Sequence, residues 1–94
     1  MSSRLTSLIA RSLLSKGFRF SDTHHRYLEL FVNGNPQGIR TRLSHGIDEY
    51  GDQLLGLMAH QLYLTKRELL ALIDCTVSAD EYVELMRERK RLKP

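Results

Sequence analysis

Three of the four histidines in this chain lie near arginines, and together they are the sequence's best candidates for chemistry. His24 and His25 stand side by side between two strand-like runs, and His45 follows a third run. An imidazole titrates near neutral pH, so it can take or give a proton where lysine and arginine cannot. Guanidinium groups suit phosphate, because their fork of N–H donors matches its oxygens. This combination indicates chemistry on RNA.

The chemistry would be general acid–base catalysis. The imidazole of either His24 or His25 could take the proton of an RNA 2′-hydroxyl, so that the 2′-oxygen attacks the adjacent phosphorus. A second group would protonate the leaving 5′-oxygen, and the route needs no metal. The alternative is that the histidines are ordinary surface or turn residues, with His45 capping a strand end. Strand neighbours point to opposite faces, so which of the pair lies on an open face depends on the register.

Basic residues gather in the same part of the chain. Between positions 4 and 42 only Asp22 and Glu29 are acidic, whereas the last third alternates in sign. Residues two positions apart on a strand lie on the same face at a distance of about 7 Å, and this spacing places Arg40 and Arg42 side by side. The basic residues of this region are Arg4, Arg11, Lys16, Arg19, Arg26, Arg40 and Arg42. The net charge of +3 is compatible with a polyanionic partner.

No metal or cofactor is expected. Structural zinc sites bring ligands in close pairs, such as two cysteines separated by two residues. His24 and His25 are adjacent on a strand and point to opposite faces, and Cys75 stands alone. We expect Cys75 to pack as a small apolar residue. The chain also lacks a glycine-rich phosphate loop.

Length and composition limit the classes of protein to which this chain could belong. The 94 residues suffice for one small domain, and 41% hydrophobic with 27% charged residues is ordinary for a soluble protein. No apolar run is long enough to span a membrane, and the N-terminus lacks the apolar segment of a secretory signal. The single cysteine implies no oxidising compartment. We therefore expect a cytoplasmic protein that has no membrane association.

The hydrophobic periodicity changes twice along the chain. A helical period over 4–16 precedes alternating runs over 18–20, 24–32 and 38–43, and it returns from residue 49. Asn33-Gly34 followed by Pro36 predicts a hairpin turn, because Pro36 cannot continue a ladder. Capping boxes that begin at Thr65 and Ser78 predict helices over 66–74 and 79–91.

This order predicts an α+β fold. We expect an α-β-β-β-α domain over residues 1–94, with a three-stranded antiparallel meander, helices on one face and further C-terminal helices. The expected core comprises Leu5, Leu8, Ile9, Leu13, Leu28, Leu30, Ile39, Leu43, Leu54, Leu55, Met58 and Leu62. His60 is expected to be structural. A helix-turn-helix over 55–73 is the rival, but its second helix would offer a DNA groove mostly leucine.

The motifs in this order resemble those of a known family. The first helix runs into Lys16-Gly17-Phe18, Thr23-His24-His25-Arg26-Tyr27 opens a strand, and Leu43-Ser44-His45-Gly46 closes another. Residues 5–65 thereby resemble the HicA toxins, small ribonucleases of type II toxin–antitoxin systems that have a double-stranded-RNA-binding-domain-like fold. Asp22-Thr23 stands where the family has Gly-Ser, and residues 66–94 form a helical extension that the compact toxins lack.

The resemblance implies a metal-independent mRNA interferase, or an inactive relative that binds RNA, with a HicB-like antitoxin as partner. His24 aligns with the family's catalytic histidine and is the expected base. The expected RNA contacts are Arg19, His25, Arg26, Arg40, Arg42 and His45. The alternative is a non-enzymatic interaction module, in which the apolar C-terminal helices form a homodimer or partner surface. That surface would comprise Leu69, Leu72, Ile73, Tyr82, Val83 and Leu85.

Overall fold

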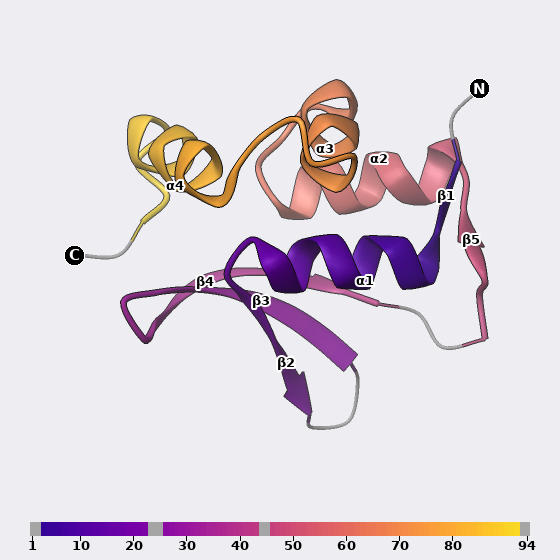
Figure 1. The fold of residues 1–94 in the computed structure, drawn as a ribbon, viewed down its shortest axis with the longest axis horizontal. Coiled ribbons are helices and arrows are strands. Elements are labelled where there is room, and N and C mark those ends of the chain that lie inside the picture. The colour runs from indigo at the N-terminus through magenta and orange to yellow at the C-terminus, as the bar shows by residue number, and fades with distance from the viewer. Residues whose placement is uncertain (1–2, 23–25, 44–45, 93–94) are drawn as a thin grey trace.

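A three-stranded antiparallel meander lies along one side of the molecule, and the helices lie on the other side (Figure 1). The computed structural model describes residues 3–22, 26–43 and 46–92. The elements in chain order are β1 (Arg4–Leu5), α1 (Thr6–Ser15), β2 (Phe18–Asp22), β3 (Arg26–Val32), β4 (Asn35–Arg42), β5 (Glu49–Tyr50), α2 (Asp52–Gln61), α3 (Lys66–Ile73) and α4 (Ala79–Glu88). The predicted α+β class and the three-stranded antiparallel sheet are confirmed.

Strand alternation divides the sheet into a buried and an open face. In β4 the exposed and buried residues alternate from Gln37 onward, with Ile39 and Thr41 buried and Arg40 and Arg42 exposed. The buried face packs against α1 and α2. One core unites the sheet with all the helices. Its buried apolar residues are Ile9, Leu13, Phe18, Leu28, Leu30, Ile39, Leu43, Tyr50, Leu55, Met58, Ala59, Leu62, Leu64, Leu69, Leu72, Ile73, Tyr82 and Met86.

The first helix begins later than the periodicity predicts. The short strand β1 pairs with β5, and this pairing removes Leu5 from the helix. Thr6 then starts α1, and its backbone N–H and hydroxyl donate to the carbonyls of Asp48 and Ile47 at 2.8 and 2.6 Å. Leu5, which was expected in the core, is 55% exposed as a result. Leu8 and Leu54 are only partly buried.

A glycine follows the C-cap residue of this helix. Gly17 adopts a φ of +97°, which favours glycine because it has no side chain to clash. Its carbonyl accepts a hydrogen bond from Phe31 N at 3.0 Å, so the helix end is joined directly to β3. A Cβ at this position would meet the Phe31 carbonyl oxygen at 3.4 Å. The glycine therefore serves both the turn and the close approach of the two segments.

The β3–β4 hairpin turns at Asn33 and Gly34, whose φ values of +53° and +80° match the predicted turn. The expectation that Pro36 lies outside the strand is wrong, because β4 already begins at Asn35 and Pro36 pairs with Phe31. Proline is tolerated on edge strands and beside bulges. β4 is an edge of this sheet, and its register shifts beside Pro36.

The C-terminal helices belong to the core. Both predicted capping boxes are present, at Thr65 and at Ser78. The Tyr82 ring on α4 is fully buried at 5.7 Å from the Phe18 ring, and its hydroxyl donates to the Leu62 carbonyl at 3.1 Å. Burial raises the pKa of the Tyr82 phenol well above its usual value, so this donor stays neutral.

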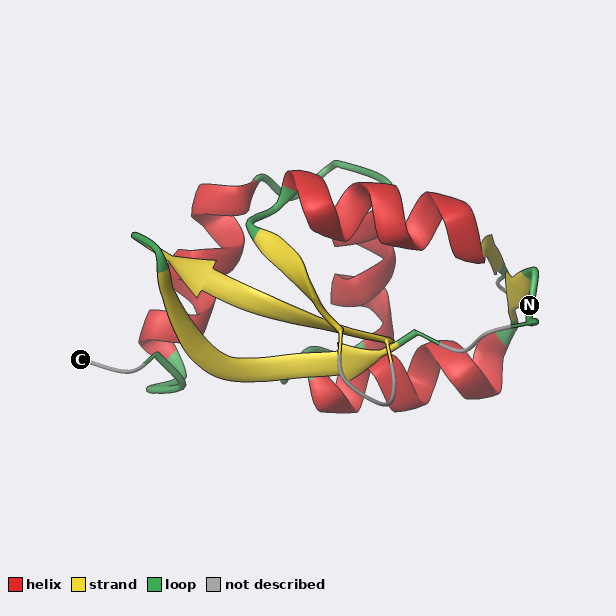
Figure 2. Ribbon diagram, turned by 90° about the horizontal axis from the view of Figure 1, so that it is seen from below, coloured by secondary structure: helices red, strands yellow, loops and turns green. Residues whose placement is uncertain are grey.

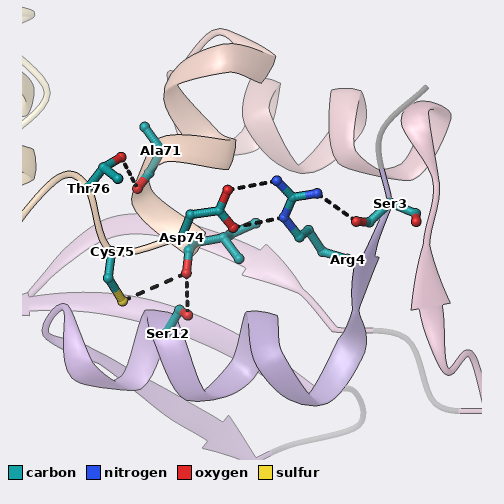
Figure 3. A network of polar contacts seen from close by, with 8 residues as sticks. Ser3, Arg4, Ser12, Ala71, Asp74, Cys75 and Thr76 are labelled. Atoms are coloured by element: carbon teal, nitrogen blue, oxygen red, sulfur yellow. Dashed lines mark hydrogen bonds and ion pairs between the residues drawn. The ribbon is translucent and has the colours of Figure 1, made fainter.

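Polar contacts join the end of α3 to the N-terminal segment (Figure 3). Arg4 donates through two nitrogens to the Asp74 carboxylate at 2.8 and 2.7 Å. The buried Ser12 hydroxyl on α1 donates to the Ile73 carbonyl at 2.7 Å, and Cys75 Sγ lies 3.8 Å from the same oxygen. Cys75, which was expected to be packed, is exposed. In the described part of the chain, no helix has the length and apolar character needed to cross a membrane.

Replacing Tyr82 with alanine should lower the free energy of unfolding by about 3–5 kcal/mol, the cost of truncating a buried aromatic side chain. Urea denaturation would measure it. Leu57 is the matched control, because it is 57% exposed and its alanine variant should change stability by no more than about 0.5 kcal/mol. Equal, small effects of the two substitutions would contradict the placement of α4 in the core.

Acid should weaken the contact between α3 and the end of α4. Arg89 and the Thr65 backbone lower the pKa of Glu68, so this carboxylate favours the folded state above its unfolded pKa. That contribution is lost as the pH falls through the lower, folded pKa. Below about pH 5 the wild type should therefore lose more stability than Arg89→Ala, by up to about 1 kcal/mol for so exposed an ion pair. Parallel curves of unfolding free energy against pH would contradict this.

Candidate nucleic-acid interface

The open face of the sheet carries the predicted arginines in register across the strands. Figure 2 shows this face in front, with the helices behind it. Arg19 on β2, Glu29 on β3 and Arg40 on β4 are direct cross-strand partners. In the next row Tyr27 pairs with Arg42. Directly opposed residues point to the same face, so the sheet brings together the side chains of three strands.

Two of these arginines lie over aromatic rings of the central strand. The Arg19 guanidinium carbon is 4.7 Å from the centre of the Phe31 ring, and that of Arg40 is 5.4 Å from the centre of the Tyr27 ring. A guanidinium over a ring is attracted by the ring's negative face, while its N–H groups stay available at the edge of the plane. The rings therefore orient the two cations without neutralising them.

Glu29 compensates only part of the positive charge of this face. Ion pairs elsewhere involve Arg4, Lys66, Arg87 and Arg89. Among the side chains that the structure describes, none of the ion pairs includes Arg19, Arg40 or Arg42. Glu29 lies between Arg19 and Arg40, and its Oε2 accepts a hydrogen bond from Gly38 N at 3.2 Å. The face therefore keeps a net positive charge.

The histidines that the sequence singles out are next in the chain to described residues at one end of the sheet. His24, His25 and His45 lie outside the described residues. The described residues that border them are close together, because Asp22 pairs with Arg26 and the next register pair is formed by Tyr27 and Arg42. The segments that contain the three histidines therefore follow strand ends at the same end of the sheet, the end that carries Arg42.

Two other predicted residues lie apart from the arginine rows. Arg26 begins β3, and only its backbone position is described. His60 was expected to be structural, but it is exposed in the last turn of α2. Within the described ranges no three histidine, cysteine, aspartate or glutamate side chains gather as they would around a metal ion. Since three of the histidines fall outside these ranges, independence of metal stays a prediction.

Sequence reasoning missed two features of this surface. The first is the contact of the Tyr27 and Phe31 rings with arginines of the neighbouring strands. Period-two alternation and the hairpin register together could have indicated this contact. A small cleft beside Arg42, between β4 and α2, was also missed. It depends on how the helix packs, and no local signal in the sequence predicts that.

A separate apolar groove runs between α1, the end of β2 and the segment before β5. Its large exposed side chains are those of Leu5, Leu14, Phe20 and Ile47, each at least 36% exposed. Leu69, Leu72, Ile73 and Tyr82, which the interaction-module hypothesis placed on a partner surface, are buried in the chain's own core. Within the described residues, the other large apolar side chains that are exposed are Leu57 on α2 and Tyr63 directly after it, so none lies on α3 or α4.

Comparison with known proteins identifies no relative: no family model, curated protein or solved structure matches this chain.

Proposed function

We propose that this chain binds single-stranded RNA across the open face of the β2–β3–β4 sheet. The observation that carries the proposal is the set of three exposed arginines without ion pairs in the described part of the chain, two of which lie over aromatic rings. Arginines that form no ion pair attract a phosphate backbone, and each contact releases a counterion. The guanidinium planes that lie over the rings offer stacking surfaces for bases.

A single strand suits this face better than a duplex. Bases that are not paired can be splayed out and stacked on aromatic side chains or on guanidinium planes. The rings of Tyr27 and Phe31 are half-buried and lie in the middle of the face, under Arg40 and Arg19. An RNA strand crossing the sheet would meet cations from both outer strands and rings from the central one.

Replacing Arg40 and Arg42 together with alanine should weaken binding of a single-stranded RNA and flatten its salt dependence. For every phosphate that the variant no longer binds, the slope of log affinity against log salt should fall by about 0.7, the value for a single strand. Fluorescence polarisation at several salt concentrations would measure both quantities.

The matched control is the double variant Arg67→Ala/Arg87→Ala, which removes the same charge from exposed positions on α3 and α4. Its affinity should stay near that of the wild type after correction for net charge. If the two double variants lose affinity and slope equally, binding is a matter of overall charge, and the sheet face is not the site.

The proposal extends to ribonuclease activity of the HicA kind. Apart from the two-residue strands β1 and β5, the succession α1-β2-β3-β4-α2 has the α-β-β-β-α order of that double-stranded-RNA-binding-domain-like family, and the C-terminal helices are added to it. The chain reaches toward His24, His25 and His45 from the end of the sheet that carries Arg42. In this proposal His24 is the base, the arginines hold the phosphates, and a HicB-like antitoxin covers the same end.

Replacing His24 with alanine should slow RNA cleavage by about 10²–10⁴-fold, the usual contribution of a general base, and should leave RNA affinity largely unchanged. Cleavage of a labelled RNA would be followed in the presence of a chelator. His60→Ala is the control, because that histidine is exposed on α2. Cleavage that survives His24→Ala would contradict the assignment, and RNA binding without cleavage in the wild type would identify a binding protein only.

A further inference from the structure

The cleft between β4 and α2 opens beside one of the sheet's exposed arginines. Its volume is about 130 Å³, and Arg42 forms part of its wall. The apolar part of the lining comes from Leu54, Leu57 and Met58 of α2. Leu57 is 57% exposed, so its side chain is accessible to a ligand that enters the cleft. The cleft is therefore accessible, largely apolar and next to a cation that could hold a phosphate.

The polar side of the cleft is held in a defined orientation. The buried Thr41 hydroxyl on β4 donates to Gln61 Oε1 on α2 at 2.5 Å. In this contact Oε1 of the Gln61 amide faces the strand. The Nε2 group donates no hydrogen bond within the described part of the chain, and Gln61 is exposed. An oriented amide donor is thus available to a ligand in the cleft.

The size of the cleft indicates what could enter it. An engineered apolar cavity of about 150 Å³ holds one benzene molecule, so a cleft of similar volume accommodates one six-membered ring. Among the bases of RNA, this description fits a pyrimidine better than a purine. Uracil carries two carbonyl acceptors on its ring where cytosine carries one, and Gln61 Nε2 is a donor beside the cleft.

We propose that this cleft receives one pyrimidine base of the bound RNA, with uracil preferred, and that Gln61 is the residue that determines the preference. The inference rests on the proposed RNA binding and adds a specificity site to it. Arg42 borders both the open face and the cleft, so a phosphate on Arg42 would place the adjoining base at the cleft's entrance. The ring would lie against Leu57, and a carbonyl oxygen would accept from Gln61 Nε2.

The test compares fluorescently labelled oligouridine, oligocytidine and oligoadenosine of equal length by fluorescence polarisation at one salt concentration. The wild type should bind oligouridine tightest. Gln61→Leu should reduce the preference for oligouridine over oligoadenosine by about threefold to tenfold, the effect of one hydrogen bond. The affinity of oligoadenosine, which depends on phosphate contacts, should change little.

Gln61→Leu also removes the partner of the buried Thr41 hydroxyl, and misfolding of this variant would lower its affinity as well. A second variant that leaves this hydrogen bond in place is therefore tested. Leu57→Ala alters only an exposed wall of the cleft and should likewise lower the uridine preference. Its matched control is Leu5→Ala, because Leu5 is 55% exposed in the other groove and its loss should leave the preference intact.

The outcomes separate this inference from the proposed function. Equal affinity of the wild type for all three oligonucleotides, or a preference unchanged in both cleft variants, would overturn the pyrimidine site and leave RNA binding standing. Failure of the wild type to bind any of the three would overturn both. Weaker binding of all three by the same factor in the cleft variants would also overturn the site, because it would show a contact without base selectivity.

Discussion

Burial of one face of the β2–β3–β4 sheet beneath the helices is the constraint on which the rest of the structure depends. Leu28, Leu30 and Ile39 point into the core, so the residues between them must point away from it. Arg40 and Arg42 are on the open face for this reason alone. A register slip of one residue would put charge in the core, and the fold therefore fixes the chemical character of its open face.

The C-terminal helices complete this burial. A sheet and two helices of this size bury little apolar surface, and small domains are marginal for that reason. Here α3 and α4 contribute Leu69, Leu72 and Tyr82 to the same core as the sheet. Tyr82 reaches Phe18 at the start of β2, and Gly17 joins that strand's beginning to β3. The helices thus stabilise the strand that carries Arg19.

Much of the fold could be predicted from local patterns. The strand alternation, the hairpin at Asn33, the glycine at position 17 and both capping boxes depend on residues close together in the sequence, and each is present. The predictions that were wrong depend on contacts between residues far apart in the sequence. Leu5 lies outside the helix because its segment pairs with residues 49–50. Pro36 is tolerated within a strand because that strand lies at the sheet edge.

The candidate site was predictable to a similar extent. The shared face of Arg40 and Arg42 followed from alternation, but the contact of Arg19 with Phe31 required the cross-strand register. The cleft at Gln61 required the packing of α2 on β4, which no short pattern encodes. The role of the histidines rests on the family resemblance and on the arrangement of the strand ends that border them.

The most direct test of the central claim is a nuclear magnetic resonance titration of the isotopically labelled protein with a single-stranded RNA. The account predicts that the largest chemical-shift changes fall on the arginine side chains at 19, 40 and 42 and on the rings of Tyr27 and Phe31. Resonances of Arg67 and Arg87, on α3 and α4, should change little. Changes confined to the helices, with the open sheet face unaffected, would contradict it.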